Sequence, residues 1–497
     1  MQKRNVLWGL LLVLIIATFL RTYQLDKFPA GLYPDEAMNG NNALEAIKTG
    51  DYKVYYPENN GREGLFINVQ AQFLRLIGIN EPWVLRLLSA LVGILTVAGM
   101  YLFGQELFSR KVGLLAAFFL ATSFWHINFS RIGFRAISAC MFAVWGFYLL
   151  WLALRESNER KSGAWQAVLG GIIFGLGFHT YIAYRVTPLL LLIPLIYFRK
   201  NKGFWKIMVA FLLGAFVAGL PIGIYYLQNP GDFFGRTSQI SVFSSDSTIR
   251  DLALNIGKTF AMFFFNGDYN WRHNYAGRAE FFWPVAIMFL SGIILGVATI
   301  FKKYIGFKEL HGENDPESGA RKMRASFWLI FLWFGLGFLP VVISNEGLPH
   351  ALRALLLIPP AIILAAVAGV WLHEKAKAYV LPRILSGFVV LFLTLLFLEA
   401  YQTYFLLWGP NQNTRDAFAA SYVNIGKQIN QTSRLREKYV IVEGSGTDVR
   451  GLPMPTQTVM FLTDTFLPQN QEDKRVHYVL PSQINQIPPG ALRFYLR

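Results

Sequence analysis

Cysteine is nearly absent from this sequence: among 497 residues only Cys140 occurs, so neither an intrachain disulfide nor a thiolate metal cluster can form. Charged residues are also scarce, at 15%, while apolar residues make up 54%. This composition is too apolar for a soluble protein of this length. The lack of cysteine therefore excludes a disulfide framework, and the low content of charged residues favours a polytopic membrane protein.

The formal net charge of +16 would also fit a nucleic-acid-binding protein. Such a protein concentrates Lys and Arg on one solvated face, whereas many basic residues of this chain lie in short loops between apolar runs. A membrane accounts for this distribution, and we expect no nucleic-acid partner.

Long apolar runs recur through most of the chain. A membrane-spanning helix needs roughly 20 predominantly apolar residues. Eleven stretches qualify, some of them short: 5–21, 84–105, 112–130, 136–154, 164–180, 186–198, 206–227, 281–301, 326–344, 352–372 and 383–400. The first run resembles a signal peptide, but no small-residue cleavage site follows it, so we interpret it as a retained anchor.

Basic loops predict the orientation in the membrane. Arg110-Lys111 and Arg199-Lys200 lie between spans on what should be the cytoplasmic side, because cytoplasmic loops are enriched in Lys and Arg. We therefore expect a multi-pass protein of the plasma (inner) membrane with a cytoplasmic N-terminus. Residues 1–400 form its transmembrane domain, and three segments are exterior: loops 22–83 and 228–280, and a small C-terminal α/β module, 401–497.

Local patterns within the exterior segments predict further elements. Apolar spacing from Ala37 to Thr49, ended by Gly50, predicts a short interfacial helix, and Phe66 to Ile77 repeats the pattern. Residues 249–265 are amphipathic and lead into 266–274, a stretch dense in groups suited to a sugar or headgroup. The C-terminal pattern predicts a helix at 414–430 and strands at 439–443, 458–462 and 476–480.

Two adjacent carboxylates, Asp35 and Glu36, follow the first span at the boundary between lipid and water. Transfer of a glycosyl group to a hydroxyl requires a base near the acceptor, and Asp35 could supply it while Glu36 holds the loop or assists. Asp35 could equally cap the helix that starts near Ala37. On the residues alone, the two interpretations have about equal weight.

The exterior turns carry arginine, although basic residues are expected mainly in the cytoplasmic loops. Arg131, Arg135, Arg185 and Arg353 come from separate turns on the same side, and a guanidinium suits a phosphate better than an ammonium does. Any one of these arginines would more often anchor a helix end among lipid headgroups. As a set, they predict stabilisation of a departing phosphate.

Four histidines also lie on this side: His126, His179, His273 and His350. Their spacing resembles no zinc motif, and individually each would more often be structural than a ligand or a base. We therefore expect neither a metal nor another cofactor, while leaving a divalent metal requirement open.

Several short motifs together resemble a known family. The exterior Asp35-Glu36, the helix ending in Thr49-Gly50 and the stretch Gly61-Arg62-Glu63-Gly64 are similar to the membrane-embedded glycosyltransferases of the C fold (GT-C). The resemblance is to the protein O-mannosyltransferase and aminoarabinose-transferase-like superfamily, glycosyltransferase family 39. Further similar stretches are Trp83 to Ala90, Ser130-Arg131 and His350 to Arg353 with Pro359-Pro360. Where this chain has Gly61 to Leu65, many relatives carry a proline-rich stretch, which leaves the acceptor side undefined.

The resemblance implies an all-α polytopic fold and an inverting hexosyl- or pentosyltransferase. Its donor would be a polyprenyl-phosphate-linked sugar, and its acceptor a hydroxyl of a protein, lipid or glycan. It carries the catalytic role onto Asp35, with Glu36 beside it. The residues expected to bind the donor phosphate or sugar are Arg62, Glu63, Arg131, Arg135, Tyr181, Arg185, His350 and Arg353.

Two alternatives remain at this stage. A transporter or flippase of lipid-linked sugars would place ionisable groups or broken helices near the middle of the bilayer, but the predicted span centres contain no Asp, Glu, Lys or Arg. A flippase with a merely polar cavity survives this argument. A glycan ligase or polymerase is chemically closer, and the sequence barely separates it from a transferase.

Overall fold

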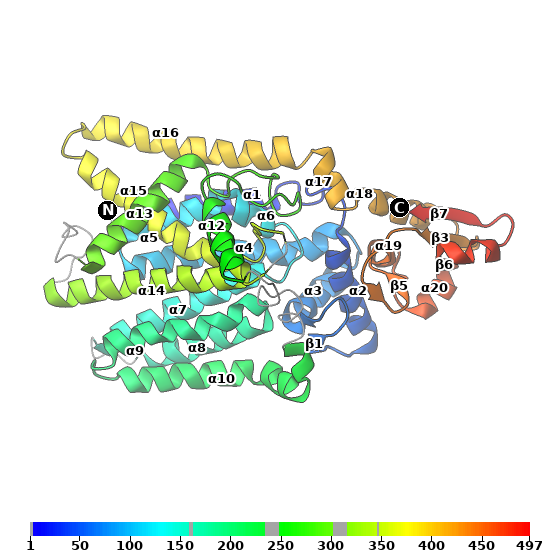
Figure 1. Ribbon diagram of the computed structural model, residues 1–497, viewed down its shortest axis with the longest axis horizontal. Helices are drawn as coiled ribbons and strands as arrows, with labels where there is room; N and C mark the ends of the chain where they lie inside the picture. The colour runs from blue at the N-terminus through cyan, green and yellow to red at the C-terminus, as the bar shows by residue number, and fades with distance from the viewer. Residues whose placement is uncertain (1–2, 159–162, 234–247, 302–315, 345–346) are drawn as a thin grey trace.

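The computed structural model describes residues 3–158, 163–233, 248–301, 316–344 and 347–497. A bundle of long helices forms one end of the molecule, and a mixed α/β segment forms the other (Figure 1). Residues 234–247 of the expected exterior loop 228–280 lie outside the described residues.

Within the described residues, eight helices are long and apolar enough to cross a membrane. They are α1 (Lys3–Thr22), α4 (Pro82–Leu107), α7 (Ile137–Asn158), α10 (Phe204–Gln228), α13 (Trp283–Phe301), α14 (Pro316–Val342), α15 (Ile358–Ala376) and α16 (Pro382–Tyr401), the last continued by the π-helix η5 (Gln402–Trp408). Together with the helical content, they confirm the all-α polytopic fold class.

Three of the eleven expected spans are shorter or broken. The stretch 112–130 divides at Ser123, which caps the short α6 (Phe124–Phe129) after α5 (Arg110–Thr122). The stretch 164–180 is α8 (Ala164–Leu176) with one 3₁₀ turn, η1 (Gly177–His179). The stretch 186–198 is a 3₁₀ segment, η2 (Ile182–Leu191), followed by α9 (Leu192–Phe198). Pro188 lies inside η2, where it cannot donate a helical hydrogen bond.

Burial within the bundle separates inner helices from outer ones. In the most apolar part of α15, 83% of residues are buried, against 11% in α16. Large apolar side chains of the outer helices are exposed, including Leu213, Phe216, Phe388 and Val390. A soluble protein rarely exposes so much contiguous apolar surface, so these faces meet lipid.

The segment after α1 folds over one end of the bundle. Helix α2 (Pro34–Thr49) begins with proline at its first position and ends at Gly50, whose φ of 75° is the left-handed conformation that favours glycine. A hairpin of β1 (Tyr55–Tyr56) and β2 (Arg62–Glu63) follows, and then α3 (Gly64–Ile77). The two helices expected from the apolar spacing are present, but each starts two or three residues earlier than expected.

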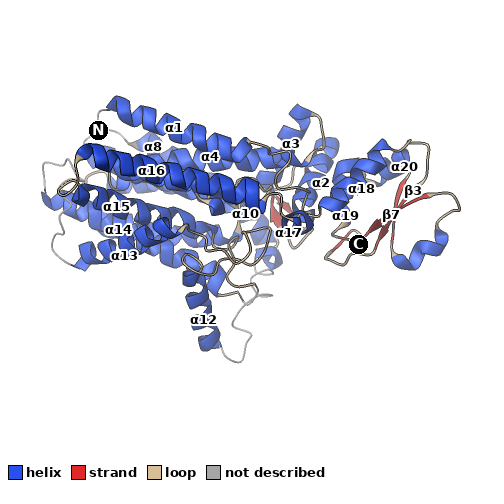
Figure 2. Ribbon diagram, turned by 90° about the horizontal axis from the view of Figure 1, so that it is seen from above, coloured by secondary structure: helices blue, strands red, loops and turns tan. Residues whose placement is uncertain are grey.

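Helix α12 (Thr248–Ala261) covers most of the expected amphipathic stretch and projects from the bundle (Figure 2). The loop that follows it, residues 266–280, is fixed at several points. Asn128 Nδ2 donates to the Arg272 carbonyl at 2.9 Å, and Trp408 Nε1 donates to the Trp271 carbonyl at 2.9 Å. This loop therefore has a defined place beside the outer turns.

Residues 412–497 form the C-terminal module. It consists of α17 (Gln412–Ala417), α18 (Ala420–Gln431), β3 (Lys438–Val442), β4 (Asp448–Val449), β5 (Leu452–Pro453), α19 (Thr456–Thr463), α20 (Pro468–Lys474), β6 (Val476–Val479), the 3₁₀ segment η6 (Pro481–Gln486) and β7 (Leu492–Leu496). Strands β6, β3 and β7 form a parallel sheet in that order. Ala419, with φ of 53°, breaks the single helix expected at 414–430 into two.

The prediction of a strand at 458–462 in the module is wrong. Residues 458–462 belong to helix α19, although Thr458 and Val459 favour strands. The helix is completely buried and packs on α2, where Asn41 Nδ2 donates to the Gln457 carbonyl at 3.1 Å and to Gln457 Oε1 at 2.9 Å. Tertiary packing therefore overrides the local preference of this segment.

Candidate active site

A cavity of about 540 Å³ lies where the outer turns meet the C-terminal module. Its walls come from α2, the β1–β2 hairpin, the turns before α7 and η2, the turn at 347–354 and the C-terminal module. We refer to it as the outer cavity. Its polar lining includes Asp35, Asn39, Asn59, Arg62, Arg135, Tyr181, His350, Arg353, Asp416, Tyr422, Ser445 and Thr447.

Asp35 lies in the first turn of α2 and lines the outer cavity. It is the second residue of the helix, while Tyr33 is the N-cap, so the capping role considered for Asp35 does not apply. Asn59 Nδ2 donates to Asp35 Oδ1 at 2.7 Å and fixes the carboxylate. A half-buried carboxylate held in this way can accept a proton from a hydroxyl in the cavity.

Glu36 points away from the outer cavity and is fully buried. Its carboxylate forms an ion pair with Arg86, with Arg86 Nε at 2.9 Å from Glu36 Oε2, and accepts a hydrogen bond from the Gly133 amide at 2.7 Å. Arg86 also donates to the carbonyls of Pro29 and Gly31. These contacts favour the loop-holding role over direct assistance.

The hairpin places Arg62 in the cavity wall. Its Nη1 donates to Asn39 Oδ1 at 2.7 Å and its Nη2 to Asn42 Oδ1 at 2.5 Å. Burial, with repulsion from Arg135, lowers the pKa of Arg62 to about 10, so the guanidinium stays charged at neutral pH. Gly64, just after the hairpin, has no room for a side chain, because an added Cβ would lie 2.0 Å from the Lys53 carbonyl oxygen.

Arg135 and Glu63 form an ion pair at the cavity wall, with Arg135 Nε at 2.7 Å from Glu63 Oε2. Burial opposes the charge on Arg135, but the Glu63 carboxylate raises its pKa overall. Arg135 lines the outer cavity, whereas Glu63 lies behind it and orients the guanidinium. Tyr181 lines the cavity as well.

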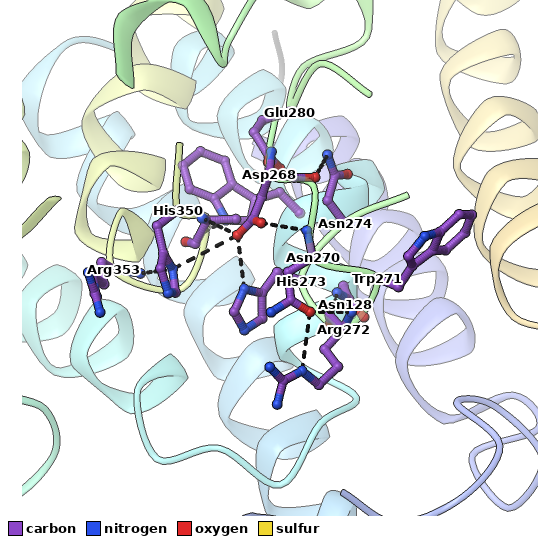
Figure 3. Close-up of polar contacts among 12 residues, drawn as sticks. Asn128, Asp268, Asn270, Trp271, Arg272, His273, Asn274, Glu280, His350 and Arg353 are labelled. Atoms are coloured by element: carbon purple, nitrogen blue, oxygen red, sulfur yellow. Dashed lines mark hydrogen bonds and ion pairs between the residues drawn. The ribbon is translucent and has the colours of Figure 1, made fainter. Parts of the chain in front are cut away.

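His350 and Arg353 reach the cavity from the turn at 347–354. The Arg353 guanidinium donates a hydrogen bond to Ser344, and the Arg353 amide donates to His350 Nδ1 at 3.5 Å. Behind His350 lie Asp268 and His273, whose side chains point toward one another (Figure 3). These two residues come from the polar stretch at 266–274, but sequence reasoning did not connect them to His350.

Two of the expected phosphate ligands lie elsewhere. Arg131 is fully buried, stacks on Tyr404 at 4.9 Å from its ring centroid and donates to the carbonyls of Leu20, Gln24 and Phe28. Arg185 donates to the Phe233 carbonyl and to the Tyr226 hydroxyl. Both arginines therefore hold backbone and aromatic partners, and neither lines the outer cavity.

The C-terminal module contributes residues that the sequence did not indicate. Asp416, Tyr422, Ser445 and Thr447 line the cavity. None of them belongs to a recognisable motif, and their role depends on how the module docks on α2.

Comparison with known proteins agrees with the fold. Residues 65–225 match the family model described as dolichyl-phosphate-mannose-protein mannosyltransferase. No curated protein matches the sequence.

Among solved structures, the chain is similar to ArnT from Cupriavidus metallidurans bound to undecaprenyl phosphate. The TM-score is 0.55 at 14% identity, covering 96% of this chain and 90% of that one. It is also similar to the archaeal oligosaccharyltransferase AglB from Archaeoglobus fulgidus, in complex with an inhibitory peptide and a dolichol-phosphate. There the TM-score is 0.53 at 14% identity, over 93% of this chain and 64% of that one. These matches confirm the resemblance to C-fold membrane glycosyltransferases.

Proposed function

We propose, from the fold that this chain shares with the C-type membrane glycosyltransferases, that it transfers a sugar from a polyprenyl-phosphate donor to a hydroxyl acceptor. The observation that carries this proposal is the composition of the outer cavity. Asp35 shares it with Arg62, Arg135 and Arg353, which come from three separate segments. A general base and a set of cations in one cavity are what this reaction requires.

In the proposed reaction, the acceptor oxygen attacks the anomeric carbon of the donor sugar. Asp35 takes the proton of the acceptor hydroxyl as the new carbon–oxygen bond forms. The bond between the anomeric carbon and the phosphate oxygen breaks, and the polyprenyl phosphate leaves with the electron pair. Arg62, Arg135 and Arg353 stabilise the charge that grows on the phosphate. Because this is a single displacement, the anomeric configuration inverts.

The donor class is supported by the two structural neighbours, which were solved with undecaprenyl phosphate and with a dolichol-phosphate. The apolar outer faces of α10 and α16 allow a lipid tail to remain in the bilayer while its headgroup reaches the cavity. We further propose that the cavity faces the exterior of the plasma membrane. The bundle end that holds the N-terminus lies opposite the C-terminal module (Figure 1), as a cytoplasmic N-terminus requires.

The test is transfer from a panel of radiolabelled polyprenyl-phosphate sugars by the purified protein in lipid vesicles. The native chain should release label from one donor class, and Asp35→Asn should lower the rate by about 100-fold or more, because a general base contributes at least that much. Asp51→Asn is the matched control. Asp51 is an exposed carboxylate of the same loop that does not line the cavity, so this variant should keep native activity.

Native transfer by Asp35→Asn would refute the assigned base. No release from any donor, with labelled lipids crossing the bilayer, would instead favour the flippase.

A further inference from the structure

Asp268, His273 and His350 form a cluster that we call the triad. Asp268 and His273 come from the loop at 266–280, and His350 comes from the turn at 347–354, so the triad joins two segments that are far apart in the sequence (Figure 3). Asp268 and His273 are buried, and His350 is partly exposed at the wall of the outer cavity.

The donor atoms of the triad converge. Asp268 Oδ2 lies 2.9 Å from His273 Nδ1 and 3.9 Å from His350 Nδ1, and all three donor atoms lie within 4.8 Å of one another. Two ligand atoms bound to one tetrahedral zinc ion are separated by about 3.4 Å, given bond lengths near 2.1 Å. The distances from Asp268 Oδ2 to the two histidines lie on either side of this value. A rotation of the His350 side chain would bring its Nδ1 into position to coordinate the ion.

The contact between His350 and Asp268 is the open one in the triad. Asp268 Oδ2 accepts hydrogen bonds from the His273 ring and from the Ala351 amide, whereas His350 Nδ1 lies 3.9 Å from it, which is too far for a hydrogen bond. A cation bound to all three side chains would bring His350 into the set.

We propose that Asp268, His273 and His350 bind one divalent cation, and that the ion is zinc. Two imidazoles and one carboxylate are a donor set that zinc prefers, and three protein ligands leave a position for water or for a substrate oxygen. This inference goes beyond the proposed function, because metal binding at the triad does not depend on the transfer reaction.

Cation binding at the triad is coupled to the release of a proton. His273 Nδ1 donates a hydrogen bond to Asp268 Oδ2 at 2.9 Å, so this nitrogen must lose its proton when it coordinates the ion. The affinity of the site for a cation should therefore rise with pH.

Backbone groups orient the Asp268 carboxylate as the outer partners of a metal ligand do. The Asn270 amide donates to Oδ1 at 2.8 Å, and the Ala351 amide donates to Oδ2 at 2.8 Å. A bound ion would tie the loop at 266–280 to the turn at 347–354, and so fix His350 and Arg353 at the cavity wall. The ion would thereby hold these two side chains in place in the outer cavity, where the donor is proposed to bind.

The test measures metal on the full chain, purified in detergent through a tag without histidine. The protein is stripped with a chelator, incubated with zinc, desalted and analysed by mass spectrometry of the metal content. We expect about one zinc per chain, as for a three-ligand protein site. Cobalt in place of zinc should give visible absorption bands, which report coordination by nitrogen and oxygen.

The variants Asp268→Asn, His273→Gln and His350→Gln should each lose the zinc and the cobalt bands. His373→Gln is the matched control, because His373 lies at the end of α15, outside the triad, and should leave both unchanged. His350→Gln is the most informative variant, since His350 is the least buried member and its replacement is the least disruptive to folding. Zinc should also raise the unfolding temperature of the native chain but not that of His350→Gln.

A native chain that retains no stoichiometric zinc and shows no cobalt bands would overturn the proposal, and would leave the triad as a hydrogen-bonded cluster. Retention of the ion by all three variants would overturn it equally. Neither result depends on sugar transfer, so the outcome is separate from that of the Asp35→Asn experiment.

Discussion

Asp35 and Glu36 are neighbours in the sequence but face different surroundings. Successive residues of an α-helix point about 100° apart. In the first turn of α2, one carboxylate therefore faces the outer cavity, while the other enters the protein and meets Arg86. The two adjacent carboxylates thus differ: Asp35 lines the outer cavity, and Glu36 is held in a buried ion pair.

Glu36→Gln should destabilise the protein by about 3–5 kcal/mol, because it leaves the buried Arg86 guanidinium without its negative partner. Unfolding of the detergent-solubilised protein, followed by near-ultraviolet circular dichroism, measures this loss. Asp35→Asn should change the stability by less than about 1 kcal/mol, since its carboxylate is only half-buried. A Glu36→Gln variant with native stability but no transfer activity would show that Glu36 takes part in the chemistry.

The sequence alone identifies the arginines of the exterior turns, but it does not show which of them line the cavity. Arg135 and Arg353 line the cavity. Arg131 and Arg185 instead donate hydrogen bonds to backbone carbonyls and pack against aromatic rings. A guanidinium in an outer turn looks the same in either case, because its partners come from distant segments. The triad was missed for a similar reason, since His350 meets Asp268 only through the fold.

Helices α2 and α19 are the elements that connect the two ends of the chain. Gly40 of α2 allows their close approach, because a Cβ at this position would lie 2.5 Å from Phe461 Cδ2 and 2.9 Å from Leu85 Cδ1. Phe461 is fully buried and cannot swing away. The glycine is therefore required for packing rather than for a special backbone angle.

Gly40→Ala should destabilise the docking of α19 on α2 by about 1–3 kcal/mol through overpacking, despite the better helix propensity of alanine. Limited proteolysis of the C-terminal module should become faster than in the native protein. Gly387→Ala in α16 is the matched control, because no atom lies within 4 Å of its added Cβ, and it should leave proteolysis unchanged. Equal proteolysis of the two variants would contradict the packing argument.

The same contact explains why the sequence mispredicted α19. Its residues have the composition of a buried strand, and the helix is apolar or neutral on every side. Periodicity cannot separate a fully buried helix from a strand in so short a segment. By contrast, β3 and β6 were predicted correctly, because each is an apolar run close to charged or turn-forming residues.

At the scale of the whole molecule, the helical bundle was predictable because its apolar runs are long. The number of long helices was overestimated at three places: the chain breaks at Ser123, α8 ends at Leu176, and Pro188 lies within a 3₁₀ segment. The outer cavity was not predictable, since its walls combine α2 with a module that begins at residue 412, far along the chain.

The proposed topology can be tested by labelling single cysteines in a Cys140→Ser background. Cys140 is buried and donates to the Leu355 carbonyl, which a serine hydroxyl can also do. A membrane-impermeant maleimide added to intact cells should label Arg434→Cys in the C-terminal module, and should leave Tyr379→Cys, between α15 and α16, unlabelled until the cells are opened. Labelling of Tyr379→Cys in intact cells would reverse the assigned orientation.

The contact between Asn41 and Gln457 spans 416 positions of the sequence. Ribosomes add about 5–20 residues each second, so roughly 20 to 80 s separate the synthesis of these two partners. During that time the segment carrying Asp35 is already made, but one wall of its cavity does not yet exist. A chain still being translated therefore cannot form the complete cavity until the residues of the C-terminal module have been added.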